Sequence, residues 1–352
     1  MPLVGKYKIY GKEGEYPVAR HLGIDLGTSN TRFWLKEKGI LLRSPSAVAI
    51  DNKSRDVVAV GSDARRMVGK TPVHLSAYRP VQDSVVTNLE VTSTMLHEFF
   101  VRTNCTGFFN KPTVLAASPY RLTDVERLAI ETAILDAGAK SVAMIDAPLA
   151  AALGAGLRIS DPRGCMVCDI GGGTTEIAVI SSGGIVRARS LRVGGDKLDQ
   201  AIINYCKYRK DLIVGDTAAE MAKRQLAVAT PDIDRGSMQI FGRNVRTGLA
   251  TTQTIASGEV CQALRAPIEA IIRAIITTIE ETPPEIAGDI FDFGIMLTGG
   301  GANIPGLAAH ISKQVGVRVT VAKHPTDAVC QGLGKFIEHP KLTSKQLIYR
   351  SR

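Results

Sequence analysis

The stretch GIDLGTSNTRFWL, residues 23–35, is written a second time, with changes, as CDIGGGTTEIAVI, residues 168–180. Each copy has apolar residues that end in an aspartate, then a turn of small residues, then alternating apolar residues. This is the pattern of a strand, a tight turn and a second strand. Asp25 aligns with Asp169, and Gly27 aligns with Gly171. We therefore expect two matched hairpins, and such repetition indicates a duplicated architecture rather than two unrelated turns.

The residues of both turns suit the binding of phosphate. Small residues let the backbone approach an anion and point several N–H groups at it, while hydroxyls add donors. A carboxylate at the same spot repels phosphate, so it indicates a divalent cation between them, and Mg²⁺ accepts carboxylates, waters and phosphate oxygens together. A single Asp-x-Gly would more often be an ordinary β-turn. The predicted phosphate and metal residues are Asp25, Gly27, Thr28, Ser29 and Asn30 in the first copy, and Asp169, Gly171, Gly172, Gly173 and Thr174 in the second.

Three later segments carry features of a nucleoside site. In MLTGGGANIPGL (residues 296–307) an apolar strand opens into bare glycine backbone, against which a base or ribose could lie. In RVGGDKLDQAIINY (192–205), glycines break a strand before a helix. In AAEMAKRQLAVA (218–229), polar residues share one helix face, which could bind a ribose and stack on an adenine. Taken singly, these segments also fit an ordinary turn and a solvated helix. The predicted residues are Gly194, Gly195, Asp196, Glu220, Lys223, Arg224, Gly299, Gly300, Gly301 and Ala302.

The composition describes an ordinary globular protein of two domains, with 352 residues, 45% of them hydrophobic and 22% charged. No apolar run approaches the ~18 residues that span a bilayer, and the N-terminus lacks a signal-peptide core, so we expect a cytoplasmic protein. The six scattered cysteines suit reduced thiols. A net charge of +9 suits anionic lipid or nucleic acid. Because no nucleic-acid-binding signature accompanies that charge, we expect no nucleic-acid partner.

Strand and helix patterns alternate in each half, which favours two α/β lobes. One helix begins at a capping box of Thr123 and Glu126, stops at Gly138, and is expected to bury an apolar face. That face consists of Val125, Leu128, Ala129, Ala133 and Ile134. A second apolar helix is predicted over roughly 258–281, ending at TPPE.

The domain boundaries follow from these patterns. We expect a first lobe over residues 20–161 with a small insertion at about 51–82, and a second lobe over 162–338 with a small insertion at about 206–252. Residues 1–19 and 339–352 are expected to be terminal extensions. No low-complexity linker separates the halves, so the lobes are expected to share a hinge and a cleft.

The segments GIDLGTSNT, DIGGGTTEIAVIS, VGGDKLDQAIINY, LTGGGANIPGL and KHPTDAVCQGLGK resemble the phosphate, connecting and adenosine motifs of the actin/Hsp70/sugar-kinase superfamily. Over residues 20–338 the resemblance is to the MreB and Mbl group of bacterial actin homologues. It implies a two-lobed actin-like ATPase fold, built from duplicated RNase H-like α/β domains with small inserted subdomains and an interlobe nucleotide cleft. It also implies ATP or ADP with Mg²⁺, and antiparallel double filaments of the chain itself. These filaments would lie on the anionic inner face of the cell membrane, where they would determine cell shape with membrane proteins of the wall-synthesis machinery.

The same resemblance implies catalytic roles for three residues: Asp25, Asp169 and Thr174. The two aspartates would hold the metal through water. One departure concerns hydrolysis, because relatives carry two acids before a proline, whereas this chain has Asp146 and Ala147 before Pro148. Alanine cannot align a water nucleophile, so we expect slow hydrolysis with binding retained. Asp146 would substitute only if the strand end shifted, since its side chain should point away from its neighbour's site.

Phe108 and Phe109 lie between turn residues in NCTGFFNKP, residues 104–112, where this family inserts an exposed loop into lipid. Two loop aromatics suit a membrane interface, although aromatic residues more often pack into the core.

Other classes of protein share the nucleotide-binding fold. A sugar or acetate kinase would need larger insertions and a substrate-facing base. A short Hsp70-like nucleotide-dependent chaperone or reactivating factor fits the length and is the alternative function.

Overall fold

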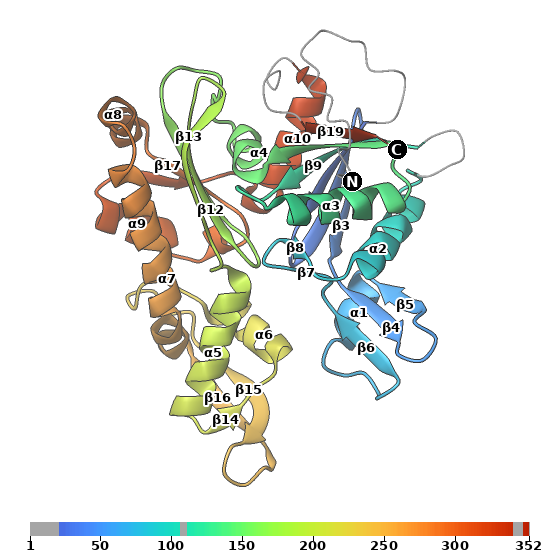
Figure 1. Cartoon of the computed structure of the whole chain (residues 1–352). Helices are drawn as coiled ribbons and strands as arrows, with labels where there is room; N and C mark the ends of the chain where they lie inside the picture. The colour runs from blue at the N-terminus through green and yellow to red at the C-terminus, as the bar shows by residue number, and fades with distance from the viewer. Residues whose placement is uncertain (1–20, 106–110, 341–347, 352) are drawn as a thin grey trace. The chain divides into compact units, whose positions relative to one another are not determined.

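The computed structural model describes residues 21–105, 111–340 and 348–351. These residues form two compact units (Figure 1). Unit 1 holds the described residues up to Pro162, the short stretch Ile180–Ile185, and those from Thr326 onward. Unit 2 holds Arg163–Val179 and Val186–Pro325. The chain therefore leaves unit 1, builds unit 2, and returns to unit 1.

A six-stranded sheet with the order β19-β10-β9-β1-β2-β3 is the centre of unit 1. Strand β1 pairs in antiparallel with β2, as the first hairpin predicts, and in parallel with β9, which pairs in parallel with β10. The carboxyl ends of β1, β9 and β10 therefore meet at one edge. The strands are β1 (His21–Leu26), β2 (Asn30–Leu35), β3 (Gly39–Pro45), β9 (Thr113–Ser118), β10 (Ser141–Asp146) and β19 (Ile348–Ser351).

Helices cover both faces of this sheet. Helices α2 (Leu89–Arg102) and α3 (Asp124–Asp136) pack on the face that carries Leu22 and Ile24, both fully buried (Figure 1). Side chains alternate along a strand, so Gly23 faces the opposite way, where a Cβ would lie 3.0 Å from Leu333 Cβ of α10 (Ala328–Glu338). The same opposite face holds α4 (Ala147–Gly154), which packs on α10.

Glycines bring α4 and α10 into backbone contact. A Cβ on Gly154 would clash with the carbonyl oxygen of Ala328, and a Cβ on Gly332 would clash with that of Ala150. We expect Gly332→Ala to lower the free energy of unfolding by about 1–3 kcal/mol, because overpacking forces two helix backbones apart. Denaturant unfolding of the purified variant measures this. Gly316→Ala is not a suitable control, since Gly316 has φ +73°, whereas Gly288→Ala adds a Cβ in open space and should cost far less.

Smaller elements complete unit 1. A three-stranded sheet has the order β5-β4-β6, and a two-stranded hairpin joins β7 to β8. These elements are β4 (Val48–Asp51), β5 (Val57–Val60), α1 (Ser62–Met67), β6 (Leu75–Tyr78), β7 (Val81–Gln82) and β8 (Val85–Val86).

Unit 2 is built on a five-stranded sheet with the order β13-β12-β11-β17-β18. Strands β11 and β12 form the second predicted hairpin, and the far end of the β12–β13 hairpin belongs to the stretch grouped with unit 1. The strands are β11 (Cys165–Ile170), β12 (Thr175–Ser181), β13 (Gly184–Leu191), β17 (Ile295–Thr298) and β18 (Val319–Val321). The helices are α5 (Gly195–Arg209), α7 (Ser257–Glu280), α8 (Pro284–Phe293) and α9 (Leu307–Val315), with a short 3₁₀ turn η1 (Gly301–Asn303). A second 3₁₀ turn, η2 (Pro325–Asp327), lies where the chain passes back to unit 1.

A second, smaller sheet in unit 2 has the order β14-β15-β16. Its strands are β14 (Leu212–Ile213), β15 (Ser237–Asn244) and β16 (Ala250–Ala256), and α6 (Asp216–Leu226) packs on it. The predicted helix over 258–281 is confirmed as α7, and its first turn is closed by Glu259, which accepts the Ala256 N–H at 2.9 Å.

The capping box of α3 is confirmed, because Thr123 Oγ1 accepts the Glu126 N–H while Glu126 accepts the Thr123 N–H. The predicted buried face of α3 is partly wrong. Val125 is 77% exposed and Leu128 is 45% exposed. The buried stripe instead begins at Ile130 and continues through Ala133 and Ile134. The helical period identifies apolar positions, but the neighbouring α2 and sheet decide which stripe is covered.

Candidate functional site

In unit 1, Ser46 closes the turn of the first hairpin. Gly27 N–H donates to the Asn30 carbonyl at 3.2 Å, and Ser46 binds both sides of the turn. Its Oγ donates to the Gly27 carbonyl at 2.6 Å, and its N–H donates to the Ser29 carbonyl at 3.1 Å. Ser46 is fully buried, so it holds the turn in one shape. Sequence reasoning missed Ser46, which lies 16 residues beyond the hairpin turn on the chain and meets it only through β3.

The Thr28 hydroxyl has a defined partner. Ser84 N–H, in the tight turn between β7 and β8, donates to Thr28 Oγ1 at 2.9 Å. Asp83 and Ser84 both have positive φ, 48° and 63°, which this two-residue turn requires. Because Thr28 Oγ1 accepts an N–H, its own proton is available for another acceptor, such as a phosphate oxygen. Arg79 Nη1 lies 3.5 Å from Ser29 Oγ, so a cation missed by the sequence analysis stands beside the turn.

Four alternating charges extend from Asp25 along unit 1. Arg32 Nη1 donates to Asp25 Oδ2 at 3.3 Å, across the β1–β2 pair. Arg32 Nε lies 3.3 Å from Asp327 Oδ1 without hydrogen-bond geometry, and Arg43 binds both oxygens of Asp327. Burial raises the pKa of Asp25, and Arg32 opposes that rise. Hydrogen bonds from Arg43 lower the pKa of Asp327. The arrangement orients Asp25 with a fixed counter-charge, which no sequence motif predicted.

Asp146 lies on the other face of the same sheet. The parallel register pairs Ile24 with Ala116 and Ala116 with Met144, so Ile24 and Met144 lie on the same face of the sheet, which packs on α2 and α3. Asp146 is two residues beyond Met144 on β10, so it lies on that face as well. Asp25 alternates to the opposite side. Burial raises the pKa of Asp146, and Arg127 of α3 opposes that rise. The structure therefore does not bring Asp146 together with Asp25.

The raised pKa of Asp146 gives a testable pH dependence. The folded protein binds this proton more tightly than the unfolded chain, so the contribution of Asp146 to stability falls as pH rises from the unfolded pKa through the folded one. We expect Asp146→Asn to be more stable than wild type at pH 7, by up to about 1 kcal/mol. The difference should vanish below about pH 3, where Asp146 is protonated in both states. Urea unfolding at the two pH values measures this, and an equal difference at both would contradict it.

In unit 2, the second hairpin has the same turn closure. Gly171 N–H donates to the Thr174 carbonyl at 2.8 Å. The predicted Gly194–Gly195 break lies directly on this turn, because Gly195 N–H donates to the Gly171 carbonyl at 3.0 Å. Asp196 N–H donates to the Gly172 carbonyl at 2.8 Å, at the start of α5. A Cβ on Gly194 would lie 2.8 Å from backbone atoms of residues 171–173, so only glycine permits this approach.

Asp169 is oriented by a buried hydroxyl. Thr298 Oγ1 donates to Asp169 Oδ1 at 2.6 Å, and Thr298 is fully buried at the end of β17, paired with Asp169 of β11. Sequence reasoning missed Thr298, although it stands directly before the glycine run. Gly299 has φ +80°, and a Cβ there would clash with the Ile170 carbonyl. The turn that continues through Gly300, Gly301 and the buried Ala302 therefore lies against the end of β11.

The three charged residues predicted on α6 take different roles. Lys223 Nζ donates to the Gly195 carbonyl at 2.8 Å and to Asp199 Oδ2 at 2.7 Å, and burial lowers its pKa. Lys223 thus ties α6 to the glycine turn at the start of α5. Glu220 and Arg224 instead form an ion pair with each other at 2.7 Å, in which the Arg224 side chain is mostly exposed. Phe108 and Phe109 lie outside the described residues.

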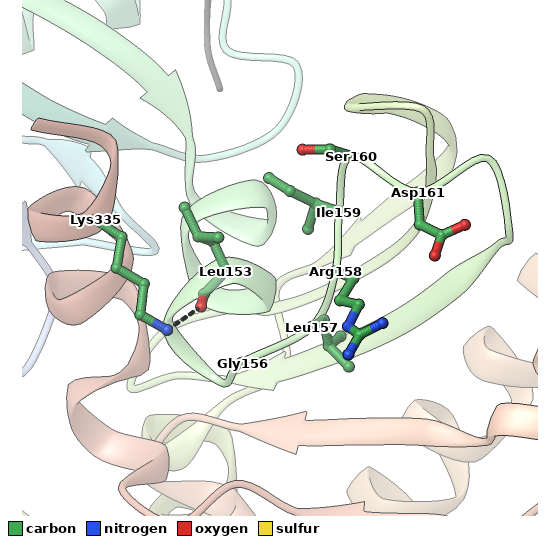
Figure 2. Close-up of a pocket in the computed structure, with 8 residues that line it drawn as sticks. All are labelled: Leu153, Gly156, Leu157, Arg158, Ile159, Ser160, Asp161 and Lys335. Atoms are coloured by element: carbon green, nitrogen blue, oxygen red, sulfur yellow. Dashed lines mark hydrogen bonds between the residues drawn. The ribbon is translucent and has the colours of Figure 1, made fainter. Parts of the chain in front are cut away.

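Unit 1 also contains a cavity of about 500 Å³ (Figure 2). The segment after α4, residues 156–161, forms one wall. Lys335 of α10 forms another, and its Nζ donates to the Leu153 carbonyl at 2.8 Å. None of the residues predicted for phosphate, metal or nucleoside lines this cavity. It is therefore separate from the hairpin turns.

Across 21–105, 111–340 and 348–351, no three His, Cys, Asp or Glu side chains gather where they could hold a metal ion. Asp25 and Asp169 each supply one carboxylate beside a hairpin turn, and one or two carboxylates with waters and phosphate oxygens are the ligands that Mg²⁺ usually takes beside nucleotides. Over the same ranges, none of the helices has the length and apolar character to span a membrane.

Comparison with known proteins gives one family. The model of the MreB/Mbl protein family matches residues 19–345. The cell shape-determining protein Mbl of Bacillus subtilis (strain 168) is 44% identical over 330 residues, which cover 94% of this chain and 99% of that protein. The cell shape-determining protein MreB of Escherichia coli (strain K12) is 41% identical over 322 residues, which cover 90% of this chain and 93% of that protein.

Solved structures give the same result. MreB5 of Spiroplasma citri bound to ADP has a TM-score of 0.87 and 33% identity, and covers 92% of this chain and 98% of its own. The same protein bound to AMPPNP has a TM-score of 0.88 and 33% identity, and the match covers 93% of this chain and 98% of that one. Coverage of this extent includes both units.

Proposed function

Because this chain belongs to the MreB/Mbl family, with its actin-like fold, we propose that it is an ATP-binding, filament-forming cytoskeletal protein that determines cell shape. One observation carries the proposal: each unit holds a hairpin of the same construction. In both, an aspartate is the last residue but one of a strand, and a glycine N–H closes the turn on the carbonyl three residues later, at 3.2 Å in one and 2.8 Å in the other. Relatives named as cell shape-determining proteins, and a relative solved with ADP and with AMPPNP, support it.

The proposed nucleotide contacts follow from these turns. Thr28, Ser29 and Asn30, together with residues 171–174, would donate N–H and hydroxyl groups to the phosphates. Residues 299–302 would hold the nucleoside, together with Glu220 and Arg224, while Lys223 supports the turn at Gly195. Mg²⁺, when bound, would offset the phosphate charge. Asp25 and Asp169 would hold it through water, and each is oriented by its own partner, Arg32 and Thr298 respectively.

We propose that hydrolysis of ATP to ADP and phosphate is slow. Ala147 is the first residue of α4 and carries no polar atom, and Asp146 faces α2 and α3 rather than the side of Asp25. Phosphoryl transfer depends on positioning of the attacking water, so binding should persist while turnover is weak.

We also propose that the filaments are antiparallel double filaments, and that they lie on the inner face of the cell membrane beside proteins of the wall-synthesis machinery. Electron microscopy of the protein with ATP tests the antiparallel pairing. The net charge of +9 supports attraction to anionic lipid. Phe108 and Phe109 would enter the lipid interface. Flotation with anionic vesicles tests this, because a Phe108→Ser/Phe109→Ser double variant should lose most vesicle binding. Unchanged flotation would argue against a role for these two residues.

The proposed function is tested by titration and sedimentation of the purified protein. Calorimetry should show binding of ATP and ADP in the presence of Mg²⁺, and pelleting should require nucleotide. A folded protein that gives no heat with adenine nucleotide would refute the proposal. A stable monomer that binds nucleotide and captures a client enzyme would instead support the Hsp70-like reactivating factor.

A further inference from the structure

Four charged side chains of unit 1 form a row beside the first hairpin turn. Asp25 pairs with Arg32 across β1 and β2, and Arg32 pairs with Arg43 across β2 and β3. Asp327, at the start of α10, contacts both arginines. The side chains of Asp25, Arg32 and Asp327 are 16%, 16% and 13% exposed, so salt screens their interactions only weakly. We call Asp25, Arg32, Asp327 and Arg43 the charge row.

The geometry of the charge row directs Arg32 mainly to Asp25. Arg43 binds Asp327 as a fork, in which Nε donates to Oδ1 at 3.1 Å and Nη2 donates to Oδ2 at 2.9 Å. Arg32 Nη1 donates to Asp25 Oδ2 at 3.3 Å, whereas Arg32 Nε lies 3.3 Å from Asp327 Oδ1 without hydrogen-bond geometry. Arg43 therefore satisfies Asp327, and Arg32 makes its hydrogen bond to Asp25.

The charge on Asp25 has opposite effects on a metal ion and on a phosphate. A full negative charge attracts the waters of Mg²⁺, but it repels a phosphate that arrives without metal. The guanidinium of Arg32, 3.3 Å away, offsets that charge and so weakens both effects. The two arginines and two aspartates of the charge row cancel in formal charge, so the first turn carries little net charge to repel a phosphate.

We propose that Arg32 is a positioning residue that sets how strongly nucleotide binding depends on Mg²⁺, and that it acts through the charge of Asp25. The inference rests on the proposed nucleotide-binding function and names a residue that tunes the same site. Arg43 and Asp327 act one step further away, because they decide how much of the Arg32 charge offsets Asp25. We define the metal ratio as the Kd for ADP in EDTA divided by the Kd for ADP in saturating Mg²⁺.

Variants of Arg32 give the first test, by competition against a fluorescent ADP analogue in EDTA and in Mg²⁺. Arg32→Gln should raise the metal ratio by about tenfold or more, because binding in EDTA weakens while binding with Mg²⁺ stays the same or tightens. Arg32→Lys keeps the cation and should return the ratio to within about threefold of wild type. A structural role alone would weaken binding equally in both conditions, so an unchanged ratio in Arg32→Gln would refute the inference.

Two milder variants should move the metal ratio in opposite directions, which damage to the fold would not do. Arg43→Gln leaves Asp327 to draw on Arg32, so Asp25 recovers charge and the ratio should rise by about threefold. Asp327→Asn removes the competing carboxylate, so the ratio should fall by about threefold. Arg43 is 57% exposed, so its variant should fold as wild type does. Shifts of the same sign in both variants would contradict the inference.

A surface arginine of the same unit gives the matched control. Arg66 is 74% exposed and pairs with Asp63 outside the charge row. Arg66→Gln removes the same charge as Arg43→Gln, and its metal ratio should stay within about 1.5-fold of wild type. A shift as large as that of Arg43→Gln would show that net charge, rather than the charge row, sets the metal dependence.

A double-mutant cycle tests whether Arg32 acts through Asp25. In an Asp25→Asn background, Arg32→Gln should change the metal ratio by less than about threefold. A full tenfold change there would show that Arg32 meets the phosphates directly, which overturns the inference. If wild type binds no ADP in either condition, the proposed function fails. If wild type binds ADP and the metal ratios of all variants agree, the inference fails and the proposed function stands.

Discussion

Asp169→Asn should lower the affinity for ATP in the presence of Mg²⁺ by more than about 100-fold, a loss of roughly 3 kcal/mol. The reason is that asparagine keeps the shape and can still accept the Thr298 hydroxyl, but it removes the negative charge that would hold the metal waters. Calorimetric titration with ATP, with and without Mg²⁺, measures the effect. Without metal, the variant should bind at least as well as wild type, because the carboxylate then only repels phosphate.

The control for this experiment separates charge from orientation. Thr298→Val keeps the Asp169 charge but removes its donor, and it should weaken binding with Mg²⁺ by about tenfold, between wild type and Asp169→Asn. The thermal unfolding midpoint of each variant verifies folding. Equal affinities for wild type and Asp169→Asn at saturating Mg²⁺ would show that Asp169 does not take part in metal binding.

Ala147→Glu should accelerate phosphate release by about 100-fold. A carboxylate at the first residue of α4 could accept a hydrogen bond from the attacking water and orient it, and effects of this size follow from positioning a nucleophile. Single-turnover release of phosphate from ATP with Mg²⁺ measures the rate, and the affinity for AMPPNP should stay near wild type. Both Ala147 and Asp146 lie at the junction of β10 and α4, so the added side chain enters no tightly packed core.

Ala147→Gln is the matched control, because it has similar length and no charge. It should give a smaller acceleration, since an amide orients water without taking up its proton. Asp146→Asn should leave the rate unchanged, because Asp146 faces α2 and α3. A wild-type rate that already equals that of Ala147→Glu would show that the chain hydrolyses ATP without an acid at this position.

Structural features that depend only on residues close together in the sequence were predictable. The two hairpins, the capping box at Thr123 and helix α7 all follow from turn chemistry or from the spacing of apolar residues within one element. The docking of Gly194 on the second hairpin is also consistent with its sequence, since two adjacent glycines allow close backbone approach. The prediction for α3 was wrong because burial of a helix face depends on the element that packs against it. Val125 is apolar and lies on the predicted face, but nothing among the described residues covers it.

Much of the candidate site depends on residues that are distant in sequence. Ser46 reaches the first turn through the pairing of β2 with β3, and Ser84 reaches Thr28 from a separate hairpin. Asp327 meets Arg32 because the chain returns to unit 1 after building unit 2. Single hydroxyl or carboxylate residues do not recur at a regular spacing in the sequence, so no pattern predicts which distant residue they will contact.

By itself, the sequence determined the duplicated strand–turn–strand elements and the types of residue in their turns, because these rest on backbone geometry and on side-chain alternation within a few residues. The tertiary structure alone decided which side chains orient the two aspartates: Arg32 with Asp327 in unit 1, and Thr298 in unit 2. It also decided that α10 crosses α4 at glycine backbones. These choices depend on how strands and helices from distant parts of the chain pack, and packing is a property of the assembled core rather than of any one segment.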